Sequence, residues 1–184
     1  MRLAILLVGL LALAACSSGG GSSGAAKLPL GTERTVAYSV PASGSVAAID
    51  TTLGIAALAV RQGTQAELAA GGLQVEAKDK NATPYYVDVR YTNKGTEPFD
   101  PGGLSVGMED TSGNSLPTVL ITSLSDQPYT KCKDVKMGTQ LKVGASIESC
   151  TLFLAPPGTK LDRVRFTSKG SGKSMIVFTD WAVT

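Results

Sequence analysis

Three cysteines, Cys16, Cys132 and Cys150, carry the most distinctive side-chain chemistry of this 184-residue chain. A thiol can be acylated, can form a disulfide or can ligate a soft metal ion. The chain contains no histidine, which excludes Ser-His-Asp and Cys-His catalysis together with imidazole-ligated zinc and blue-copper sites. The chain has serines and lysines that could form a Ser-Lys nucleophile, but no SxxK motif supports one. We therefore expect a protein that is not an enzyme and holds no cofactor.

The first fifteen residues predict an export signal. Arg2 precedes an apolar run over residues 3–13, which is about half the length of roughly 20 residues that a spanning helix needs. Leu13-Ala14-Ala15-Cys16 resembles the lipobox of bacterial lipoproteins, whose cysteine receives a thioether-linked diacylglycerol and becomes the mature N-terminus. We expect residues 1–15 to be the signal peptide and Cys16 to be lipidated, with an uncleaved anchor or ordinary signal cleavage as alternatives.

The next segment, residues 16–30, predicts a flexible tether. Serine and glycine dominate it up to Gly24, so it has too little apolar surface to order its backbone. The dozen or so residues before Leu28 would reach about 20 Å as a coil. Because two acyl chains hold a protein stably on a bilayer, we expect a lipid-anchored protein at the extracytoplasmic face of the cell membrane.

Lipidation of Cys16 would leave Cys132 and Cys150 as a pair in an oxidising compartment, where a disulfide is the economical expectation. Such a bond would close a loop of nearly twenty residues and stabilise the fold by about 3 kcal/mol. The alternative, a thiol pair for metal or redox work, lacks both the CxxC spacing and a histidine. Met137, Met108 and Met175 could join Cys132 in binding copper(I), although scattered methionines usually fill cores.

The charge balance is nearly even, with 17 Lys+Arg against 15 Asp+Glu, which argues against nucleic acid as a partner. Basic residues nevertheless gather in two places, Lys131, Lys133, Lys136 and Lys142 around Cys132, and Arg163, Arg165, Lys169 and Lys173 near the C-terminus. They could contact anionic lipid or cell-wall polymers. A solvated face, interspersed with carboxylates, is the alternative that the small net charge favours.

Oxygen-bearing side chains near one predicted hairpin raise the question of calcium. Glu109, Asp110, Asn114 and Asp100 could supply ligands. The same residue types are those that hairpin turns use in any case, and no EF-hand spacing is present. Calcium therefore stays an alternative to a plain turn.

Alternating apolar residues and regular turn signals predict an all-β fold. In residues 85–92, Tyr85, Val87, Val89 and Tyr91 fall on one face, the period of a half-buried strand. Strands are also predicted over residues 35–40, 53–60, 104–110, 147–154, 164–166 and 175–181, with a turn at 111–114 and a hairpin turn at 169–173, and 53–60 could also be helical. One short helix is predicted over 65–70. Seven or more strands indicate an antiparallel sandwich, and we expect residues 31–184 to form one domain.

Three segments, residues 60–64, 84–95 and 150–158, resemble actinobacterial lipoproteins that carry an immunoglobulin-like domain of unknown function. That group is similar in fold to a small secreted mycobacterial antigen. The resemblance covers most of residues 53–181 and implies an immunoglobulin-like β-sandwich, without any catalytic residues to carry over. Tyr85, Tyr86 and Trp181 could form an exposed aromatic surface, with core packing as the alternative.

Together these observations favour a cell-envelope lipoprotein that presents a non-enzymatic immunoglobulin-like module to a protein or cell-wall partner. The alternative is an envelope lipoprotein that binds a small ligand or a metal, and a histidine-free hydrolase is a weaker third possibility. The sequence does not identify the binding residues.

Overall fold

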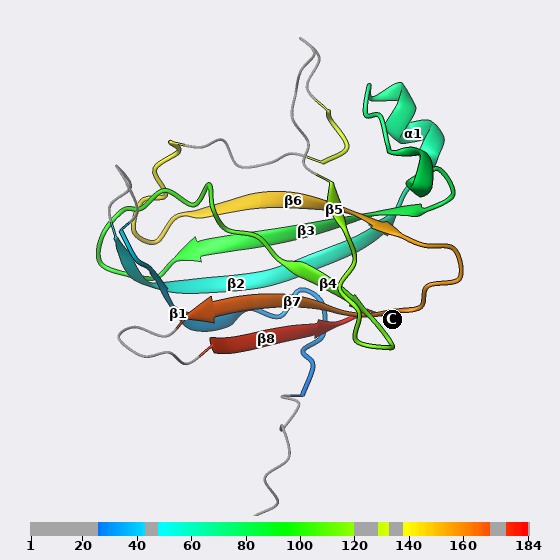
Figure 1. Ribbon diagram of the computed structural model, residues 1–184. Coiled ribbons are helices and arrows are strands. Elements are labelled where there is room, and N and C mark those ends of the chain that lie inside the picture. The colour runs from blue at the N-terminus through cyan, green and yellow to red at the C-terminus, as the bar shows by residue number, and fades with distance from the viewer. Residues whose placement is uncertain (1–25, 43–47, 120–128, 133–137, 170–175, 184) are drawn as a thin grey trace, which may run out of the picture.

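The computed structural model describes residues 26–42, 48–119, 129–132, 138–169 and 176–183, and its two antiparallel sheets face each other as a sandwich (Figure 1). The all-β prediction is confirmed. Cys16, the predicted signal peptide and the predicted tether up to residue 25 lie outside the described residues. No helix in the described part is long and apolar enough for a membrane crossing.

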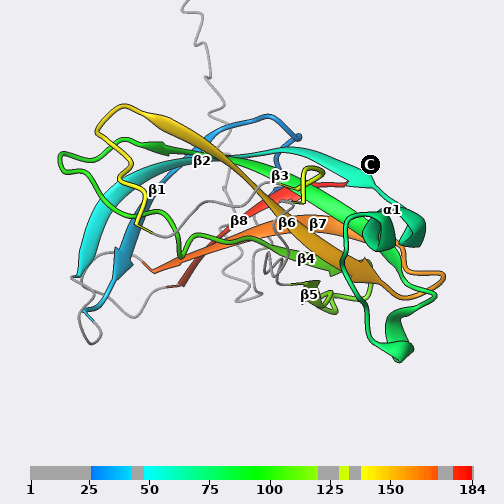
Figure 2. The same cartoon turned by 90° about the horizontal axis from the view of Figure 1, so that it is seen from above.

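The larger sheet has the strand order β1-β2-β3-β6-β5 and the smaller one β4-β7-β8. Their bounds are β1 Arg34–Val40, β2 Ile49–Gln62, β3 Thr83–Asn93, β4 Gly107–Asp110, β5 Thr118–Val119, β6 Ser146–Ala155, β7 Leu161–Lys169 and β8 Ile176–Ala182, with helix α1 at Gln65–Ala70 and a short 3-10 helix at Ala77–Asp79. Seen from above, β2, β3 and β6 extend across β7 and β8 (Figure 2).

This strand order is that of an immunoglobulin constant-type domain. The strands β2-β3-β6-β5 and β4-β7-β8 correspond to the A-B-E-D and C-F-G sheets, and β1 is an additional strand that pairs with β2 at the sheet edge. The sandwich is therefore immunoglobulin-like by topology.

Alternation along the strands builds the core between the sheets. Inward-facing side chains come from both sheets and include Leu53, Ile55, Val87, Val89, Tyr91, Met108, Phe153, Val164, Phe166 and Trp181. Trp181 is fully buried, and its Nε1 donates a hydrogen bond of 2.8 Å to the carbonyl oxygen of Thr32. Leu28 and Leu30 also pack against this core, so the folded domain includes both residues.

Most predicted elements are confirmed with small changes in their bounds. The segment at 53–60 is strand rather than helix and is longer than predicted. Helix α1 matches its predicted range because Thr64 and Glu67 form a capping box, in which the Glu67 N–H donates to Thr64 Oγ1 over 3.2 Å. The hairpin turn predicted at 169–173 lies outside the described residues after Lys169.

The strand predicted at 104–110 is shorter than expected. Its first three residues are not in β4, which begins at Gly107. The Leu104 N–H donates instead to the carbonyl of Pro101 over 2.9 Å, so a turn set by Pro101 and the following glycines occupies the place of the first strand residues.

Candidate functional site

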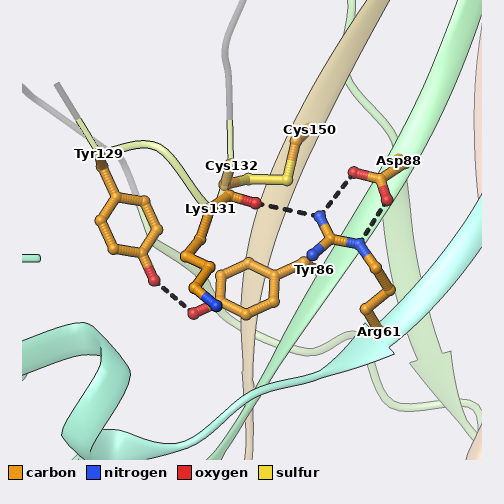
Figure 3. The surroundings of a disulfide bond; sticks show 7 residues. All are labelled: Arg61, Tyr86, Asp88, Tyr129, Lys131, Cys132 and Cys150. Carbon is orange, nitrogen blue, oxygen red and sulfur yellow. Dashed lines mark hydrogen bonds and ion pairs between the residues drawn. A yellow bond between two sulfur atoms is a disulfide. The ribbon is translucent and has the colours of Figure 1, made fainter.

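A disulfide joins Cys132 and Cys150 (Figure 3), with their Cα atoms 5.1 Å apart. Cys150 lies on β6 opposite Asp88 of β3. Its side chain points to the outer face of the larger sheet, because the residues next to it on β6 point inward, to the core between the sheets. Because both sulfurs are bonded to each other, neither is a thiolate that could hold a metal. Met108, one of the methionines considered for copper, is fully buried in the core.

The disulfide belongs to a second hydrophobic cluster on this outer face. Helix α1 contributes Leu68, β3 contributes Tyr86, and the segment at 129–132 contributes Tyr129. The rings of Tyr86 and Tyr129 lie 6.2 Å apart and their hydroxyls are hydrogen-bonded. Burial, followed by the hydrogen bond to Tyr86, raises the pKa of Tyr129 well above its usual value of 10.0. Tyr129 is therefore protonated at physiological pH.

Two glycines make room for these tyrosine rings. A Cβ atom on Gly71, directly after α1, would lie 2.2 Å from the Tyr129 ring. A Cβ atom on Gly63 would lie 2.5 Å from the Tyr86 ring. Both distances are far below a carbon–carbon contact, so the close packing of α1 and the aromatic pair depends on glycine at both positions.

Arg61 connects three segments of this face (Figure 3). Its Nε and Nη2 donate to the two carboxylate oxygens of Asp88 over 2.6 and 2.9 Å, and Nη2 also donates to the carbonyl of Lys131 over 3.0 Å. The guanidinium lies 5.2 Å from the centre of the Tyr86 ring, a cation–π distance. The hydrogen bonds to Asp88 raise the pKa of Arg61 further. We call Arg61, Tyr86, Asp88, Tyr129 and Lys131, with the disulfide, the disulfide platform.

An open hollow of about 230 Å³ lies on the platform. It is lined by Arg61, Asp88, Thr130, Lys131, Glu148, Ser149 and Cys150. Lys131 also pairs with Glu67 of α1 at 3.3 Å, whereas Glu148 is exposed on the rim. The hollow thus presents charges of both signs beside the disulfide, an arrangement suited to a polar group with its own donors and acceptors.

Sequence reasoning finds the disulfide of this platform but misses Arg61 and Tyr129 as members of it. The outward position of Tyr86 and Asp88 follows from the alternation of residues 85–92. The contact of Arg61 with Asp88 spans 27 positions, and that of Tyr86 with Tyr129 spans 43. No local pattern encodes pairs so far apart.

The structure describes four side chains of the two basic clusters, namely those of Lys131, Lys142, Arg163 and Arg165. Arg165 donates to Asp180 over 2.7 Å and to Glu109 over 2.6 Å, while Arg163 reaches Asp180 at 3.1 Å. These arginines therefore neutralise carboxylates on the outer face of the smaller sheet and do not offer free charge to lipid phosphates. Lys142 is exposed, while Lys133, Lys136, Lys173 and the side chain of Lys169 lie outside the described part of the structure.

Asp110 and Asp100, two of the carboxylates considered for calcium, serve turns, whereas the third, Glu109, is paired with Arg165. One oxygen of Asp110 accepts the backbone N–H groups of Ser112 and Asn114 over 2.8 Å, and the other accepts the Asn114 amide over 3.0 Å. Asp100 likewise accepts the N–H groups of Gly102 and Gly138. The Asn114 hydrogen bonds lower the pKa of Asp110. Within the described ranges, no three Cys, Asp or Glu residues gather as a metal site.

The exposed aromatic surface considered for Tyr85, Tyr86 and Trp181 is absent. Trp181 and Tyr86 are 0% and 2% exposed, and Tyr85 packs partly against the core. Side chains alternate along a strand, so Trp181 lies on the inner face of β8 together with the buried Thr179.

Comparisons with known proteins give no family. No family model matches the chain, and no curated protein matches it. Among solved structures it is similar to the Bacillus subtilis protein ycdA, a candidate lipoprotein, at a TM-score of 0.46 and 11% identity, over 71% of this chain and 36% of ycdA. It is also similar to yjhA from Bacillus subtilis, at a TM-score of 0.47 and 8% identity, over 84% of this chain and 98% of yjhA.

The chain thus spans about a third of the length of ycdA. Neither similarity is close enough to bear on function, and neither concerns the actinobacterial resemblance of the sequence. The immunoglobulin-like description rests on the strand order alone.

Removing the disulfide should destabilise the domain. We expect Cys132→Ser/Cys150→Ser to lower the free energy of unfolding by about 3 kcal/mol, since a loop between residues 18 positions apart is released. Urea unfolding followed by tryptophan fluorescence measures this. The unchanged chain under reductant is the control and should fall to the stability of the variant. Equal stability of all three samples would contradict a structural disulfide.

Asp180 should make the fold acid-sensitive. Burial alone would raise its pKa, but hydrogen bonds from Arg165 and Arg163 outweigh burial and hold the pKa below 3.8. This stabilisation is therefore present above the unfolded pKa of about 3.8 and is lost as the pH falls through the folded value. Asp180→Asn should cost about 2 kcal/mol at pH 6 and clearly less at pH 2. If the variant lost stability with acid as steeply as the unchanged chain, Asp180 would not be the responsible group.

Proposed function

We propose that this chain is an exported lipoprotein, acylated on Cys16, whose sandwich is a non-enzymatic interaction module at the extracytoplasmic face of the cell membrane. One observation carries the proposal, namely that the N-terminal segment joins one sheet while the disulfide platform lies on the outer face of the other. The Leu28 N–H donates to the Asp180 carbonyl, and the Ala182 N–H donates to the Leu28 carbonyl, each over 2.8 Å. The described chain therefore enters the domain at β8.

This entry point orients the domain relative to an anchor at Cys16. Figure 1 has the blue N-terminal segment below β8 and helix α1 on the opposite side of the molecule. Residues 17–27 form the link, which as a coil would reach about 20 Å. A sandwich held by so short a link keeps β8 near the bilayer and turns the disulfide platform toward the cell exterior.

The shape of the platform supports contact with a macromolecule over capture of a small ligand. Its hollow of about 230 Å³ is smaller than the roughly 300–1,000 Å³ that small-molecule pockets commonly have. The disulfide and Arg61 fix its rim, so a partner would meet a preorganised surface. The histidine-free sequence adds to this reading, because it removes the common hydrolytic mechanisms of exported enzymes.

The anchor is testable by one substitution. We expect Cys16→Ala to release the chain from the membrane fraction or to block its processing, because the residue that would carry the acyl chains is gone. Mass spectrometry of the mature unchanged chain should find the diacylglycerol on Cys16. Cys132→Ser/Cys150→Ser is the matched control and should stay in the membrane fraction. Unchanged retention of Cys16→Ala would remove the lipoprotein proposal.

The platform is testable by site-specific crosslinking on intact cells. A photoreactive residue in place of Thr130, exposed on the hollow, should give a discrete adduct. The same residue in place of Lys142, exposed in the turn before β6, is the control. Glu148→Lys should reduce the Thr130 adduct about tenfold, since it reverses an exposed charge on the rim. Equal adducts at both positions, or no effect of Glu148→Lys, would argue against the platform as the contact.

A further inference from the structure

An exposed apolar strip lies on β8, away from the disulfide platform. Ile176, Val177 and Phe178 are 53%, 39% and 48% exposed, and among the described residues Val143 is the remaining large hydrophobic side chain with comparable exposure, at 51%. Consecutive exposed apolar residues on an edge strand are unusual, because sheet edges are normally protected against association. Ile176 and Phe178 lie on the outer face of β8 with Asp180, whereas Val177 points to the opposite face, like Thr179 and Trp181. We call the two outer side chains, Ile176 and Phe178, the β8 patch.

Within the described ranges, no strand pairs with the outer edge of β8 beside the patch. β8 is an edge strand of its sheet, and Leu28 pairs along its outer edge at Asp180 and Ala182. Since backbone direction alternates along a strand, Ile176 and Phe178 direct their N–H and C=O groups toward this same edge. In the part of the chain that the structure describes, the N-terminal segment covers the second half of the edge and leaves the first half uncovered.

We propose that the β8 patch contacts the surface of the bilayer in which the chain is anchored; this rests on the proposed acylation of Cys16. The link to the anchor starts at Leu28, which lies against Trp181 of the same strand. Ile176 precedes Trp181 by five residues, about 17 Å along a strand. This distance is similar to the reach of about 20 Å that residues 17–27 have as a coil. The anchor therefore holds the patch within contact distance of the bilayer.

The chemistry of the patch fits the boundary between headgroups and acyl chains. Aromatic and aliphatic side chains can enter this boundary while the strand edge keeps its polar backbone among headgroups and water. On the outer face, the Arg165 guanidinium lies 4.7 Å from the centre of the Phe178 ring.

The arginines do not carry this contact, because both are paired with carboxylates on the sheet. Apolar side chains provide it. A strand from another protein could use the same edge, and the experiment must distinguish that outcome from a lipid contact.

Depth-dependent fluorescence quenching tests the proposal. The acylated Phe178→Trp chain is purified from membranes and reconstituted into phosphatidylglycerol vesicles with or without bromine on the acyl chains. We expect its emission to be about twofold lower with brominated lipid, because the new indole would lie near the acyl boundary. The native Trp181 is 0% exposed, so it supplies a constant background that the unchanged chain measures.

Val143→Trp is the matched control, since Val143 has similar exposure but lies in the turn before β6 of the other sheet. Its emission should be the same in both kinds of vesicle. Ile176→Asp added to Phe178→Trp should abolish the quenching, because a carboxylate opposes insertion beside anionic lipid. Quenching of Phe178→Trp no greater than that of Val143→Trp would overturn the proposal.

Addition of a strand from another protein would give a protein adduct from a photoreactive residue at position 178 and no quenching of Phe178→Trp. These two results together would also overturn the proposed bilayer contact. These results are separable from those on the anchor. The quenching test uses chains already shown to carry acyl groups, so its failure removes the β8 contact and leaves the lipoprotein intact. If no acylated chain can be recovered, both proposals fall together.

Discussion

The architecture depends on two adjacent residues of β8, Asp180 and Trp181, which face opposite sides of the smaller sheet. Trp181 fills the core, and its indole N–H is paired with the Thr32 carbonyl, so a large ring is buried without an unsatisfied donor. Asp180 is almost as buried but carries a charge, which is tolerable only because Arg163 and Arg165 donate to it. Leu28 forms its bridge opposite Trp181, through backbone hydrogen bonds with Asp180 and Ala182. Core, charge network and chain entry are thereby fixed at one place.

The opposite side of the molecule solves a different problem, because the larger sheet is apolar on its outer face as well as its inner face. Tyr86, Leu152 and Leu154 point away from the core between the sheets and need a cover of their own. Helix α1 and the segment at 129–132 supply it, but both are short pieces with little intrinsic stability. The disulfide and the carbonyl contact from Arg61 hold the second piece in place. The immunoglobulin-like topology is kept, while the disulfide lies on the outside of one sheet and does not cross the core between the two.

Local pattern was enough to predict the parts of the fold that rest on alternation. The faces of residues 85–92 and 147–154 follow from their period of two, and α1 follows from its capping residues. The start of β4 could not be predicted from alternation, because the Leu104 N–H donates to the Pro101 carbonyl in a turn and not to a neighbouring strand. The sequence left open whether Trp181 points inward or outward, because this residue lies on the last predicted strand, close to the chain end. Arg165 pairs with Asp180 and Glu109 on strands that the fold brings together, so this pairing could not be predicted from the sequence.

The pairing of the arginines changes which kind of surface the smaller sheet presents. An arginine with a free guanidinium would make the outer face basic, and a peripheral contact would then weaken strongly with salt. With Arg163 and Arg165 committed to Asp180 and Glu109, the outer face is nearly neutral in its middle and apolar toward Ile176. A contact through such a face draws mainly on removal of apolar area from water, which salt does not screen. If Cys16 is acylated as proposed, a weak contact of this kind is enough to hold one orientation, because an anchored domain meets the bilayer at high effective concentration.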